Sequence, residues 1–98
     1  MNLQANAPAP APLAIAGEMT IYRAAELKPL LLDAVRTHPA PALDLSAVTE
    51  FDSAGLQLLL MARREAARLG KRLAVPAAGA AVRDVLALLG LTLEGELP

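Results

Sequence analysis

Apolar and polar positions alternate along the chain in blocks whose lengths suit short strands followed by helices. An apolar run over 13–16 ends at Gly17 and predicts a buried strand. Over 20–36, apolar residues recur at spacings of three and four, which predicts a helix with one apolar face, interrupted by Pro29. The next block, 43–48, is short, apolar and bounded by turn residues, as expected of a central strand.

The second half of the chain repeats this order. The segment 53–69 has an apolar face and is closed by Gly70, which predicts a long helix. A short strand over 73–75, stopped by Pro76, and a last helix over 80–89 complete the pattern. Strands that alternate with helices favour an α/β domain with a mostly parallel mixed sheet of about four strands, covered by three main helices.

The composition fits one small domain. Of the 98 residues, 55% are apolar but only 2% aromatic, so the core must consist mainly of aliphatic side chains. Alanine and proline alternate over 5–12, which favours an extended and solvated chain. We therefore expect a flexible tail over 1–12 and a compact domain over 13–98.

Several functional classes are disfavoured. A net charge of −1 argues against a nucleic-acid binder, and the lack of cysteine excludes disulfides and thiolate metal sites. The single histidine, His38, precedes Pro39 in a predicted loop, which disfavours a metal site or a serine–histidine pair. No secretory signal is visible, and the apolar runs are shorter than the roughly 20 residues that span a bilayer. We expect a cytoplasmic protein without metal, cofactor or direct membrane insertion.

The dipeptide Asp52–Ser53 lies where the second helix is predicted to begin. Both residue types are favoured at helix N-termini because their side chains cap the helix, and capping by itself would account for Asp and Ser at these positions. The free amides of a helix start also favour an anion. A phosphate on Ser53 would add roughly −1.5 to −2 charges beside Asp52 and Glu50. Such a charge would disfavour a docked partner while leaving the core intact, so Ser53 is a candidate phosphoacceptor.

Helical spacing places a stripe of residues next to this position. Positions i, i+3, i+4, i+7 and i+11 are Ser53, Leu56, Gln57, Leu60 and Arg64. We interpret this stripe as part of a partner-binding face. The alternative is that Leu56 and Leu60 form the edge of a broad core face.

The chain resembles the STAS domain family, named for sulfate transporters and anti-sigma-factor antagonists. The resemblance covers nearly all of the compact region and rests on Gly-Glu-Met-Thr at 17–20, Leu-Asp-Leu-Ser at 43–46, Phe-Asp-Ser-Ala-Gly-Leu at 51–56 and the last helix to residue 91. In bacterial antagonists of this family, a partner kinase that is also the anti-sigma factor phosphorylates the serine after the aspartate. The unmodified protein captures that kinase, and phosphorylation ends the capture.

The resemblance implies that Ser53 is the phosphoacceptor and that Asp52 lies beside it in the contact surface. The other residues it assigns to this surface are Glu18, Met19, Thr20, Ala54 and Gly55. Two positions of this contact surface depart from the family pattern. Thr20 stands where many antagonists have an aspartate, and Ala54 replaces a second hydroxyl residue, which leaves Ser53 as the only acceptor in the motif.

The resemblance implies two functions. The first is a signalling switch that binds a serine kinase or anti-sigma-type protein and is controlled by phosphorylation of Ser53. The alternative is a non-enzymatic STAS subunit of a lipid-transporting ABC complex, which binds the ATPase subunit through the same surface. An enzyme is disfavoured because no base or phosphate-binding glycine loop accompanies Asp44 and Asp52. A homodimer through the helix flank stays open.

Overall fold

The computed structural model describes residues 12–91, so nearly all of the predicted flexible tail lies outside the described residues. The elements are, in chain order, β1 (Leu13–Ala14), β2 (Gly17–Met19), α1 (Ala24–Thr37), β3 (Ala42–Leu45), β4 (Val48–Phe51), α2 (Ser53–Arg68), β5 (Ala74–Ala78) and α3 (Ala80–Leu88). The predicted α/β class with three helices and parallel strands is confirmed. The predicted strand count was wrong, because the described residues form five strands rather than four.

The strands form two small parallel sheets, ordered β1-β3-β5 and β2-β4. The amide of Ile15 donates to the carbonyl of Asp44 (3.1 Å) and that of Gly17 to Ala47 (3.0 Å), which links the two sheets along one pair of bent segments. Gly17 has a φ of +81°, which suits the bend between β1 and β2. The predicted strand over 13–16 is thus observed only at 13–14, and a second strand, β2, begins at Gly17, where the prediction ended the strand.

The segment 43–48 was also predicted as one strand, with 49–51 as a connection. Instead, the chain turns at Ser46 because the Asp44 carboxylate accepts bonds from the amide and hydroxyl of that residue (2.9 and 2.6 Å). Residues 48–51 then form β4 and pair with β2. This strand delivers the chain to the start of α2.

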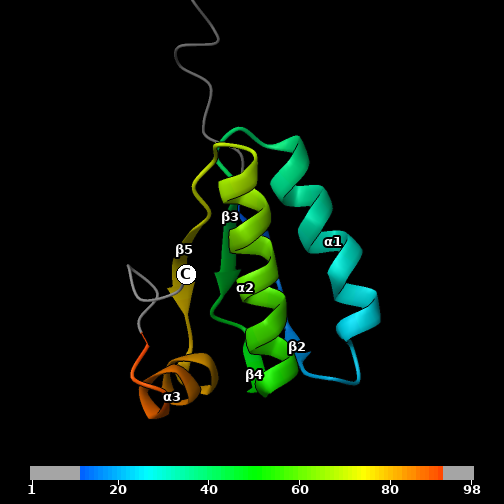
Figure 1. The fold of residues 1–98 in the computed structure, drawn as a ribbon. Helices are drawn as coiled ribbons and strands as arrows, with labels where there is room; N and C mark the ends of the chain where they lie inside the picture. Colours follow the sequence, from blue (N-terminus) through cyan, green and yellow to red (C-terminus); the bar gives the residue numbers. More distant parts are fainter. Residues whose placement is uncertain (1–11, 92–98) are drawn as a thin grey trace, which may run out of the picture.

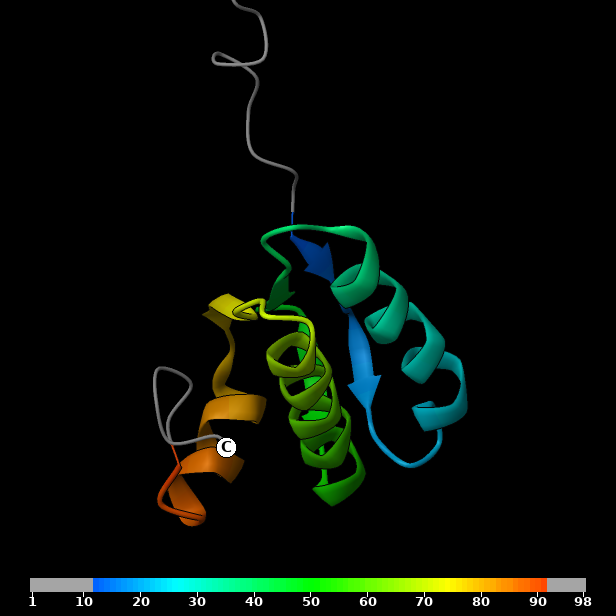
Figure 2. The ribbon, with the colours of Figure 1, turned by 45° about the horizontal axis from the view of Figure 1, so that its top comes forward.

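The two long helices lie side by side, and α3 packs against β4 (Figures 1 and 2). The predicted long helix is confirmed as α2, followed by Gly70 with a φ of +71°. Helix α1 begins at Ala24 rather than at residue 20, and runs through Pro29 as one helix. Strand β5 continues through Pro76 instead of ending there; β5 is an edge strand, where proline is tolerated.

The core between these elements is almost entirely aliphatic, as the composition predicts. Its large, fully buried side chains include Met19, Leu27, Leu31, Val35, Leu43, Leu45, Leu59 and Val82. Among residues 12–91, no helix has the length and apolar character needed to cross a membrane.

Charged side chains tie α1 to α2 at the end of the helix pair far from Ser53. Glu65 accepts bonds from the guanidinium groups of Arg36 and Arg68, both at 2.8 Å. The Lys71 ammonium group donates to the carbonyl oxygens of Val35 (2.8 Å) and Arg36 (3.0 Å), at the C-terminal end of α1. These bonds fix the relative position of the helices that carry the site described below.

We expect Glu65 to make stability depend on pH at acidic values. Hydrogen bonds from Arg68 and Arg36 lower the pKa of Glu65 from 4.5 to about 2. Because the pKa of Glu65 is lower in the folded state, this carboxylate contributes fully to the stability of the fold above its unfolded-state pKa. The contribution is lost as the pH falls through about 2. Urea unfolding of the wild type and Glu65→Gln should show a stability difference at pH 6 that shrinks towards pH 2.5. A difference in stability that stays constant over this range would show that the two arginines do not lower the pKa of Glu65.

Candidate partner-binding site

The carboxylate of Asp52 organises the region where β4 meets α2. One oxygen, Oδ1, accepts from the amide of Gly55 at 3.0 Å and caps the helix. The other, Oδ2, accepts from the amide of Ile21 at 3.2 Å. The hydrogen bond from Gly55 lowers the pKa of Asp52, and the bond from Ile21 acts in the same direction. One side chain therefore caps α2 and holds the loop between β2 and α1.

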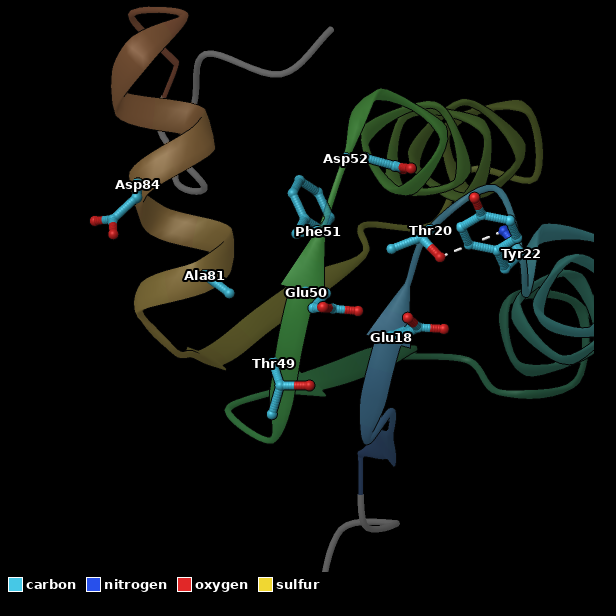
Figure 3. A pocket seen from close by; sticks show the side chains of 9 residues that line it. All are labelled: Glu18, Thr20, Tyr22, Thr49, Glu50, Phe51, Asp52, Ala81 and Asp84. Carbon is cyan, nitrogen blue, oxygen red and sulfur yellow. Dashed lines mark hydrogen bonds between the residues drawn. The ribbon is translucent and has the colours of Figure 1, made fainter.

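That loop, residues 20–23, presents two apolar side chains to solvent. Ile21 is 65% exposed and Tyr22 is 86% exposed. The loop is nevertheless held from within, because the buried Thr20 hydroxyl accepts from the amide of Tyr22 at 3.3 Å (Figure 3). The amide of Arg23 also donates to the carbonyl of Thr20 at 3.0 Å. An ordered loop that exposes adjacent large apolar side chains is typical of an interaction surface.

Arg23 closes the loop against the edge of β2. Its guanidinium group donates to the carbonyl oxygens of Ala16 (2.6 Å) and Glu18 (2.8 Å) and pairs with Glu26 at 3.0 Å. These bonds occupy edge carbonyls that could otherwise pair with a further strand. Arg23 was not among the predicted site residues, because its target groups are backbone atoms that no residue pattern reveals.

Acidic side chains lie on one side of the loop. Glu18 and Glu50 are register partners on β2 and β4, and with Asp52 and Asp84 they line an open groove (Figure 3). A hydrogen bond with the Glu50 carboxyl, reinforced by desolvation and by repulsion, raises the pKa of Glu18. No group of three or more possible ligands within residues 12–91 could hold a metal ion.

Ser53 begins α2 and is exposed, beside the carboxylate of Asp52. Of the predicted stripe, Gln57 and Arg64 are also exposed, whereas Leu60 is only partly buried against the core. Glu18 and Ala54, two other predicted contact residues, are partly buried. These positions leave a surface that includes Ser53 and the exposed side of the first three turns of α2.

Four predicted contact residues lie in the interior instead. Met19 is fully buried at the end of β2, and Leu56, 9% exposed, belongs to the core. The alternative interpretation, that Leu56 is the edge of the core face, is thus the right one for its side chain. Thr20 and Gly55 are buried as well, and Gly55 packs against the backbone of Met19. These residues support the surface from below and offer little to a partner.

The exposed apolar loop beside the start of α2 is the kind of surface that protein-interaction domains present to a partner. The family model described as "Mlab, STAS domain" matches residues 3–93. The chain therefore belongs to the STAS domain family, as its motifs indicate. Domains of this family generally mediate protein–protein interactions and are generally non-enzymatic. Among curated proteins, no significant match to the chain was found.

Proposed function

We propose that this STAS domain is a signalling switch of the anti-sigma-factor-antagonist type. It binds a serine kinase or anti-sigma-type protein when Ser53 is unmodified and releases that partner when Ser53 is phosphorylated. The observation that carries the proposal is the exposure of Ser53 on the first turn of α2, beside the carboxylate that holds the Ile21–Tyr22 loop. Modification of this hydroxyl would change the surface next to both exposed apolar side chains.

The expected effect of a phosphate differs between the free domain and the complex. In the free domain, the N-terminal dipole of α2 favours the added charge, while Asp52 opposes it. Solvent at the exposed site screens this repulsion. In a complex, a docked partner would exclude that solvent, and a charge of roughly −1.5 to −2 would have to be desolvated. The fold therefore tolerates the modification and the interface does not.

A second candidate is the non-enzymatic STAS subunit of a lipid-transporting ABC complex, which binds the ATPase subunit permanently. The observation that favours it is the apolar character of the loop, since Ile21 and Tyr22 are strongly exposed and adjacent. Permanent interfaces are more hydrophobic than transient ones. In this case phosphorylation of Ser53 would have no role in binding.

Two substitutions at Ser53 separate these functions. The partner is first recovered from native lysate with the wild-type domain, identified by mass spectrometry and purified for titration. We expect Ser53→Ala to bind it like the wild type. We expect Ser53→Asp to bind at least about tenfold more weakly, a loss of about 1.4 kcal/mol. The difference between the two variants isolates the effect of charge from that of the lost hydroxyl.

The matched control is Ala67→Asp, which adds the same charge to an exposed position near the other end of α2. Its affinity should equal that of the wild type. Equal affinity of Ser53→Asp and the wild type would refute the switch. Recovery of an ATPase as the partner, with binding unchanged by phosphatase treatment, would instead support the transporter subunit.

A further inference from the structure

We propose that the partner inserts a helical segment with aliphatic side chains flanked by carboxylates into the groove between α1 and α2. This inference rests on the proposed function in one respect, that a protein partner binds at this face. It adds the chemistry by which that partner is recognised. This α1–α2 groove is lined by Ala24 and Lys28 on α1 and by Ala54, Gln57, Leu58, Met61 and Arg64 on α2.

Small and apolar side chains shape this groove. Ala24 and Ala54 line it, and their short side chains leave space beside Leu58 and Met61. The open space is about 410 Å³, within the range of binding clefts for compact apolar groups. Ile21 also lines the groove, which makes it continuous with the exposed loop. The groove therefore offers an apolar surface on which aliphatic side chains can be buried.

Two cations border the groove, one on each helix. Lys28 and Arg64 are both exposed, and within residues 12–91 neither takes part in an ion pair. No acidic residue lines the groove; Glu18, Glu50, Asp52 and Asp84 line the other groove, and Glu26, in the first turn of α1, pairs with Arg23. A guanidinium group binds a carboxylate in a directed, charge-assisted manner. The partner segment should therefore carry acidic residues beside its aliphatic ones.

A helix suits this surface better than an extended strand. A strand would need an open sheet edge, but Arg23 already occupies the carbonyl oxygens of Glu18 on β2 and of Ala16 just before it. A groove between two packed helices instead accepts side chains spaced at i, i+3 and i+4 on one face of a third helix. The acids then fall at the sides of that face, towards Lys28 and Arg64.

The arrangement also explains how Ser53 could control binding. Ala54 lines the groove and directly follows Ser53 in α2. A phosphate on Ser53 would add negative charge at the Ala54 end of the groove and repel an acidic segment bound there. The acidic segment that pairs with Lys28 and Arg64 in the unmodified state would thus be repelled after phosphorylation, which promotes release.

The test is a selection from a displayed library of helical peptides of about four turns each. The bait is the wild-type domain, and the counter-bait is Ala54→Leu, which fills the groove and leaves Ser53 and Asp52 in place. We expect enriched peptides to combine Leu, Ile or Met at i, i+3 and i+4 with adjacent Asp or Glu. They should bind Ala54→Leu at least tenfold more weakly. Enrichment of basic peptides, or no enrichment over the counter-bait, overturns the proposal.

Charge reversals then test the border residues with the selected peptides. Lys28→Glu and Arg64→Glu should each weaken binding about tenfold, corresponding to about 1.4 kcal/mol. Arg72→Glu is the matched control, because Arg72 is exposed and lies beyond the C-terminal end of α2; its affinity should not change. Unchanged binding by both border variants would overturn the assigned recognition chemistry.

The two proposals can fail separately. If Ser53→Asp releases the natural partner but Ala54→Leu and the border variants bind it normally, the groove inference is wrong and the switch stands. If the groove variants lose the partner while Ser53→Asp retains it, the groove is the binding site and the phosphorylation switch is wrong.

Discussion

Replacing Gly55 with alanine is expected to destabilise the domain by about 2 kcal/mol, although alanine is the better helix former. A Cβ at this position would overlap the backbone oxygen of Met19 and would lie 2.9 and 3.0 Å from two atoms of the Phe51 ring. The backbone oxygen cannot rotate away, and the ring is itself buried. Overpacking costs up to about 3 kcal/mol, from which about 1 kcal/mol of helix propensity is regained.

Urea unfolding at neutral pH measures this effect from the midpoint and slope. The matched control is Gln57→Ala, an exposed position two residues further along α2, which should stay within about 0.5 kcal/mol of the wild type. If Gly55→Ala were as stable as the control, α2 would be able to move away from β2 at no cost. The close approach that positions Ser53 beside the loop would then not be a rigid feature.

Elements with a regular apolar pattern were predictable because burial on one face fixes their type. In α2, Leu59, Ala62 and Ala66 recur at helical spacing and all lie in the core. The closing glycines were equally informative, since Gly70 and Gly90 both adopt the positive φ that follows a helix end. Here local sequence and tertiary packing favour the same structure.

Elements shaped by distant contacts were not predictable in the same way. Strand β4 has only two buried residues, Val48 and Phe51, with two exposed residues between them, so no alternation indicates a strand. It forms because β2 pairs with it. The start of α1 likewise depends on the turn at residues 20–23, which Asp52 holds from a distance of 31 positions along the chain.

The site was predictable in its centre and not in its surroundings. The sequence indicated that Asp52 and Ser53 begin a helix after a strand, and both lie there. Apolar residues were assigned by pattern, which does not distinguish a buried Met19 from an exposed Ile21 or Tyr22. Which apolar side chains are exposed depends on the conformation of the loop. That conformation is fixed by hydrogen bonds between side chains and backbone groups, which a residue pattern does not reveal.

Asp52 is the residue on which this loop geometry depends, and replacing it with alanine is expected to cost about 2 kcal/mol. The variant loses the helix cap to Gly55, worth about 1 kcal/mol, and the bond to Ile21, worth about the same. Asp52→Asn is the informative companion. Its oxygen can still accept from Gly55, but its amide group would face the amide of Ile21, and two donors cannot bond. It should lose about 1 kcal/mol.

Urea unfolding gives the two stabilities, and hydrogen exchange at the Ile21 amide reports on the loop itself. Exchange should be faster than in the wild type for both variants, whereas Gln57→Ala should leave the exchange rate of the Ile21 amide unchanged. Partner affinity should fall with the loop bond even though Ser53 is intact, because the exposed Ile21 and Tyr22 side chains lose their fixed position. If the Ile21 amide exchanges in Asp52→Asn at the same rate as in the wild type, other contacts hold the loop. Asp52 would then act as a helix cap alone.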